Sequence, residues 1–103
     1  MSYNLIEKDT VKSVLQNVDI ILRTAKGEDY LRPDFGVDIL SFIDRPLTEL
    51  DKGKLKAMII DEIEFWEERA KVRSCNISVD SGVVIVNLTL EIDDEQVGYE
   101  LVY

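Results

Sequence analysis

The chain has 103 residues, 46% of them hydrophobic and 32% charged, which is the composition of one globular domain with its own core. Its 12 Lys and Arg stand against 21 Asp and Glu, and this net charge of −9 argues against nucleic acid as a partner, because phosphate binding needs a basic surface. A single cysteine and the lack of histidine exclude an internal disulfide and the common zinc sites, and they suit a reducing compartment.

Helical periodicity begins near residue 11. Asp9 or Thr10 is the expected N-cap, and Lys26-Gly27 supplies a basic last turn and a glycine stop. The apolar stripe of this predicted helix consists of Val11, Val14, Leu15, Val18, Ile21 and Leu22. Ile20 falls on the opposite face, where it is either an ordinary exposed residue or a contact.

Turn-forming residues follow the first helix. Residues 27–36 are predicted to form an ordered loop, because Pro33 favours extended backbone before it and Pro-Asp-x-Gly is a turn-forming pattern. Apolar residues between Val37 and Ile43 then predict a short helix, which Pro46 ends.

A second long helix is predicted from Glu49 to Glu68, preceded by a weak capping box of Thr48 and Asp51. Its apolar stripe is Leu55, Met58, Ile59, Ile63 and Trp66. Glu62 projects from this stripe, so its carboxylate either pairs with Arg69 or meets water where the helix overhangs the core. Glu67 and Glu68 oppose the helix dipole unless Arg69 or a partner compensates them.

After Arg69 the apolar residues alternate, which predicts strands. The first strand ends at the turn 80–82, the second runs from Val84 to Ile92, and the third follows the turn 93–96. Three strands on short turns predict an antiparallel meander. The predicted fold class is therefore α+β, with two longer helices and one short helix packed on a three-stranded antiparallel sheet in a single domain, residues 1–103.

The last predicted strand, residues 97–103, leaves a sheet edge that nothing later in the chain covers. Glu100 is the only charged residue that interrupts it. Such an edge is either a harmless C-terminal strand or a place where another strand adds.

Enzymatic interpretations find little support. No Ser-His or Cys-His pair is possible, no phosphate-binding glycine loop is present, and Cys75 lies in a strand pattern typical of an inert core thiol. Carboxylate pairs remain, but 21 acidic residues supply a pair at almost any separation. We expect no enzyme activity, no cofactor and no metal. No signal-peptide pattern or membrane-spanning stretch is expected either.

Four groups of residues together resemble a known family. They are Leu22-Arg23-Thr24, Gly27-Glu28, Arg32-Pro33-Asp34-Phe35-Gly36, and Trp66-Glu67-Glu68-Arg69 before an alternating strand. The chain resembles the small baseplate wedge proteins of contractile injection machines, which include the sheath initiators of contractile phage tails and a type VI secretion subunit. Some members carry an old lysozyme label. The family signature after the long helix is Glu-Pro-Arg, and here Glu68 replaces the proline.

The resemblance implies a structural role in assembly. Such a subunit docks on baseplate wedge proteins and starts sheath assembly when arms of sheath subunits complete its sheet. The implied partner-binding residues are Trp66, Glu67 and Arg69 at the corner, Arg32, Pro33, Asp34, Phe35 and Gly36 in the loop, and Val97, Tyr99 and Leu101 in the last strand. The implied location is the bacterial cytoplasm during assembly and then the baseplate of a phage tail or an equivalent contractile particle, with no nucleic acid, membrane or small-molecule substrate as partner.

Two alternatives remain open. The lysozyme label suggests a peptidoglycan-cleaving hydrolase that uses two carboxylates, for example Glu28 and Asp34. A generic cytosolic adaptor of the same fold is the other. The residues do not distinguish a phage tail from a secretion system or a phage-derived particle, nor do they say which sheet edge is used.

Overall fold

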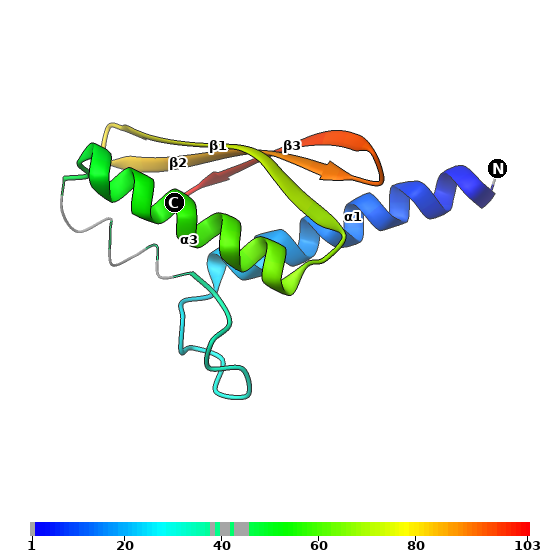
Figure 1. Cartoon of the computed structure of the whole chain (residues 1–103), viewed down its shortest axis with the longest axis horizontal. Coiled ribbons are helices and arrows are strands. Elements are labelled where there is room, and N and C mark those ends of the chain that lie inside the picture. Colours follow the sequence, from blue (N-terminus) through cyan, green and yellow to red (C-terminus); the bar gives the residue numbers. More distant parts are fainter. Residues whose placement is uncertain (1, 38, 40–41, 43–45) are drawn as a thin grey trace.

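The computed structural model describes residues 2–37, 39, 42 and 46–103, with side chains from Thr10 onward. Helix α1 spans Ser2–Arg23 and helix α3 spans Glu49–Trp66. The strands are β1, Ala70–Asp80, β2, Val83–Ile92, and β3, Glu95–Val102. The two helices lie together on one side of the sheet, and the loop after α1 lies on the far side of the helices (Figure 1).

The sheet is an antiparallel meander in the order β1-β2-β3, as predicted. Both hairpins close with two-residue turns in which both residues have positive φ, namely Ser81 with Gly82 and Asp93 with Asp94. This is the type I′ geometry whose twist matches that of paired strands. A register shift between Val72 and Ser74 marks a bulge in β1.

The core lies between the sheet and the helices. Among the described side chains, helix α1 contributes four buried ones and helix α3 contributes three, and every second residue of β2 points toward them. The buried set from these elements is Val14, Val18, Ile21 and Leu22, then Leu55, Ile59 and Ile63, then Val84, Val86, Leu88, Leu90 and Ile92. The predicted helical and alternating stripes therefore meet in one core.

Three predicted helix boundaries were wrong. Helix α1 ends at Arg23, before the predicted last turn and glycine stop at Lys26-Gly27. Helix α1 begins at Ser2 and not after Asp9 or Thr10, because the preceding residues include no glycine or proline that would stop it. Helix α3 ends at Trp66, two residues before Glu68, since Glu67 adopts an extended conformation with φ −129° and ψ 90°.

The other helix predictions have different outcomes. The capping box of Thr48 and Asp51 is present, with the Asp51 amide donating to the Thr48 hydroxyl at 3.1 Å. The predicted short helix falls largely on residues 38, 40, 41 and 43–45, which lie outside the described residues. Phe42, within the same segment, is buried in the core. In the described part of the chain, no helix is long and apolar enough to cross a bilayer.

Candidate functional site: the corner after helix α3 and the edge of strand β3

The corner between α3 and β1 is built around the carboxylate of Glu67. Glu67 is 4% exposed, and among the described residues it is the one buried charged residue. Arg69 grips it through two bonds, Nε to Oε1 at 2.8 Å and Nη2 to Oε2 at 2.9 Å. Asn17 of α1 donates its amide to Oε2 at 2.7 Å, and the Arg69 backbone amide donates to Oε1 at 3.1 Å. Four donors thus hold one carboxylate.

This arrangement sets the acidity of Glu67. The Arg69 hydrogen bonds lower its pKa from an ordinary 4.5 to about 2, against the opposing effect of burial, and Asn17 helps. Glu67 therefore stays charged at every physiological pH. A carboxyl group that donates a proton in catalysis needs a raised pKa instead.

The predicted pairing of Glu62 with Arg69 was wrong, and so was its alternative of a carboxylate that simply meets water. Because α3 stops at Trp66, Arg69 leaves the helical stripe and turns back onto Glu67. Glu62 instead accepts from Lys26 Nζ at 3.1 Å and from the Gly36 backbone amide at 3.1 Å. This carboxylate ties the loop to α3. The expected compensation of Glu67 by Arg69 is present.

The loop 32–36 packs against the last turn of α3. The Arg32 guanidinium carbon lies 3.9 Å from the centre of the Phe35 ring and 5.9 Å from that of Trp66. Phe35 meets Trp66 edge to face, with ring centres 5.1 Å apart. Asp29 holds the Arg32 guanidinium from the other side, with Nη2 to Oδ2 at 2.9 Å. Pro33 and Asp34 are exposed at the tip.

Gly36 allows the loop to approach α1 closely. Its φ is +106°, and a Cβ atom added there would lie 2.2 Å from the Thr24 carbonyl oxygen. Val37 donates its amide to the same oxygen at 3.1 Å. A side chain at residue 36 is therefore excluded by both conformation and space.

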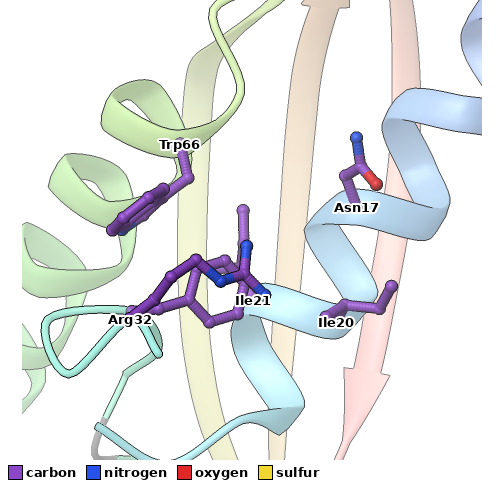
Figure 2. Close-up of a pocket in the computed structure, with 6 residues that line it drawn as sticks. Asn17, Ile20, Ile21, Arg32 and Trp66 are labelled. Atoms are coloured by element: carbon purple, nitrogen blue, oxygen red, sulfur yellow. The ribbon is translucent and has the colours of Figure 1, made fainter. Parts of the chain in front are cut away.

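A cavity of about 230 Å³ separates the loop from α1 next to the corner. Its lining residues are Asn17, Ile20, Ile21, Arg32, Phe35 and Trp66. Figure 2 shows the Arg32 guanidinium directed across this cavity toward α1, with Trp66 on the opposite wall. Ile20 lines this cavity and is half exposed, so its side chain is accessible to a partner. In the described part of the chain, no group of side chains is arranged to hold a metal ion.

The three predicted β3 residues lie apart from the corner and the loop, on the helix-facing side of the sheet. Leu101 is buried, whereas Val97 and Tyr99 are half-buried. The Tyr99 hydroxyl donates to the Asp19 carboxylate of α1, and this bond is the main cause that lowers the pKa of Asp19. Burial raises the pKa of Tyr99. Asp19 also pairs with Arg23 at 3.0 Å.

Helix α1 therefore links the two regions, through Asn17 to the corner and through Asp19 to β3. Neither residue was predicted to belong to the site. Their sequence context is an ordinary polar helix face, so a single sequence offers no signal for them. Lys26 and Asp29 were missed for the same reason, because charged loop residues normally meet water.

The family model described as baseplate wedge protein gp25 matches residues 8–97. The chain belongs to this family, and the membership supports a structural role in a phage tail baseplate. A comparison with curated proteins found no match.

A solved structure has the same fold. It is the crystal structure of a candidate tail lysozyme from Geobacter sulfurreducens, which is 24% identical to this chain. The likeness has a TM-score of 0.74 and covers 89% of this chain and 86% of the other. At this identity the likeness establishes the fold alone.

Proposed function

We propose that this chain docks on baseplate wedge proteins and starts sheath assembly by accepting a strand from a sheath subunit at the outer edge of β3. The observation that carries the proposal is the open backbone of that edge. The family membership supports the setting, and the resemblance of the sequence motifs supports the named partners.

The hydrogen-bond register identifies the open groups. Val84 and Tyr103 exchange two backbone bonds, at 2.8 and 3.4 Å, and hydrogen-bonded pairs alternate along an antiparallel ladder. Tyr99 and Leu101 therefore direct their amides into β2, where they face Leu88 and Val86. The backbone groups of Gln96, Gly98, Glu100 and Val102 point outward, and no described residue bonds them.

By comparison, the opposite edge of the sheet, strand β1, is protected against the addition of a strand. In β1 the amide of Val72 donates to the Glu64 carboxylate of α3 at 3.0 Å. A bulge follows immediately, and bulges discourage strand addition. Strand β3 has no bulge, and a Cβ atom added to Gly98 at its centre would have no described atom within 4 Å. These contrasts favour β3 as the edge that accepts a partner strand.

The corner supports docking on wedge proteins. The Glu67 carboxylate is occupied by contacts within the chain. The Arg69 side chain is about half exposed, and it has N–H donors that its pair with Glu67 does not use. A fixed guanidinium costs less entropy to bind than a mobile one. We infer that Glu67 orients Arg69 and that Arg69 meets the partner.

The test of strand addition is Glu100→Pro. This substitution removes an outward amide, so the sheet of the free protein stays intact while the incoming strand loses a bond. We expect sheath to nucleate poorly on baseplates that contain the variant, as counted by electron microscopy. Glu100→Ala is the control and should nucleate normally. Normal nucleation on Glu100→Pro baseplates would refute addition at this edge.

The test of docking is Arg69→Ala. We expect a folded protein that no longer enters baseplates assembled from the other wedge components. Arg73→Ala is the matched control, because Arg73 is also a half-exposed arginine, paired with Glu91 at 2.7 Å on the sheet. Equal incorporation of both variants would show that Arg69 is not the docking residue.

We also propose that the chain has no hydrolase activity. The lowered pKa of Glu67 supports this, and Glu28 is engaged by the Ala25 backbone amide at 3.1 Å. Purified protein should fail to clear peptidoglycan under conditions where a lysozyme does. Clearing that is lost in Glu28→Gln or Asp34→Asn would establish the hydrolase alternative instead. If the chain were a generic adaptor instead, it would bind partners other than wedge and sheath proteins.

A further inference from the structure

A second cavity, of about 480 Å³, lies on the other side of Arg32, between the loop and the last turns of α3. It is lined by Leu31, Arg32, Pro33, Asp34, Asp61, Glu62, Phe65 and Trp66. It shares Trp66 with the corner, but Glu67 and Arg69 do not line it. The chemistry of its wall and rim is specific enough to define a ligand.

The wall is apolar and unusually exposed. Leu31 is 79% exposed and Phe65 is 71% exposed, although both are large apolar side chains. Phe65 also meets Trp66 edge to face, with ring centres 5.0 Å apart. Neighbouring exposed side chains of this kind mark a docking surface. Since Arg32 already stacks on Phe35, the outer face of Phe65 remains available.

The rim carries uncompensated negative charge. Glu62 is paired with Lys26, and Arg32 is paired with Asp29, so the charges of these four residues cancel. Asp34 and Asp61 have no ion pair or side-chain hydrogen bond to any described residue. The rim of an apolar cavity therefore carries two carboxylates that no described cation pairs with.

We propose that this cavity binds an arginine or lysine side chain from an extended segment of a wedge partner. The aliphatic stem lies on Phe65 and Trp66, and the charged head lies between Asp34 and Asp61. The identity of the partner rests on the proposed function, but the chemistry of the ligand does not. An acidic side chain would be repelled, and a purely apolar one would strip water from the two carboxylates without replacing it.

The probe is the blocked tripeptide acetyl-Leu-Arg-Leu-amide, compared with the same peptide containing norleucine in place of arginine. Trp66 is the only tryptophan of the chain, so its indole N–H gives one resolved signal in a ¹⁵N-labelled sample. We expect the arginine peptide to shift this signal with at least fivefold higher affinity than the norleucine peptide. High salt should remove the difference, because the charges are at the surface.

Two pairs of variants locate the effect. Asp34→Asn with Asp61→Asn should abolish the preference for arginine, whereas Asp94→Asn with Glu95→Gln, which changes the net charge equally at a distant hairpin, should preserve it. Phe65→Ala should weaken both peptides at least fivefold. Leu50→Ala, another exposed apolar residue of α3, should weaken neither.

Equal affinity for the two peptides would overturn the proposal, as would an unchanged preference in the double Asp variant. The experiment uses the isolated chain and needs no baseplate. Its failure would therefore leave sheath initiation standing, and a failure of Glu100→Pro or Arg69→Ala to disturb assembly would leave the cavity assignment standing.

Discussion

At the corner after α3, polar groups are satisfied within the chain, whereas at the outer edge of β3 they are left open. The Glu67 carboxylate has four donors, but four residues of β3 have outward backbone groups that no described residue bonds. The corner thus has its buried carboxylate bonded within the chain, and a partner can recognise its fixed shape. The edge has outward backbone N–H and C=O groups, to which a partner strand can bond. Substitutions in both regions test this difference.

Gly36→Ala should strongly destabilise the loop beside the corner. A left-handed backbone and a 2.2 Å approach to the Thr24 oxygen together cost about 3 kcal/mol or more of unfolding free energy. Chemical denaturation would measure it. Gly53→Ala, in the second turn of α3 and with open space around it, should instead stabilise by about 0.5–1 kcal/mol. Equal effects would show that the loop does not approach α1 as described.

Proline should distinguish the two sides of β3. Tyr99→Pro removes an amide that faces β2 and should destabilise by about 3 kcal/mol more than Tyr99→Ala. Glu100→Pro removes an outward amide and should stay within about 1 kcal/mol of Glu100→Ala. Urea midpoints of the four variants provide the measurement. A large cost at both positions would mean that the outer edge is already bonded.

Glu67→Gln tests whether the negative charge of Glu67 stabilises the corner. The pKa of Glu67 is lowered in the folded protein, so its stabilisation is present above pH 4.5 and is lost as the pH falls toward 2. The neutral variant should be less stable by about 2 kcal/mol at pH 7 and should lose this part of the acid dependence. Urea denaturation at pH 7, 4 and 3 measures both effects. Parallel pH profiles would contradict the role of the charge.

Glu68→Pro should have the smallest effect, and it should be stabilising. Glu67 is already extended, as a residue before proline must be, and the Glu68 amide donates to no described residue. We expect a gain of about 0.5 kcal/mol in thermal unfolding, with Glu68→Ala as the control. Destabilisation would show that the corner differs from the Glu-Pro-Arg corner of the family.

The apolar periodicity of the sequence predicted the fold well, because the residues that repeat with this period are the ones that form the core. The stripes on both helices and the alternation in β2 survive in the buried set, and the Ser81-Gly82 turn is where its chemistry placed it. Polar contacts were predicted poorly, because they depend on where elements end and on their tertiary approach. The Glu62 error followed from extending α3 past Trp66, and no pattern marks Asn17 as a partner of Glu67.

Asn17 and Asp19 are two residues apart on α1, yet one touches the corner and the other touches β3. A load applied to β3 would therefore reach the corner through less than one turn of helix α1, without passing along the loop or either hairpin.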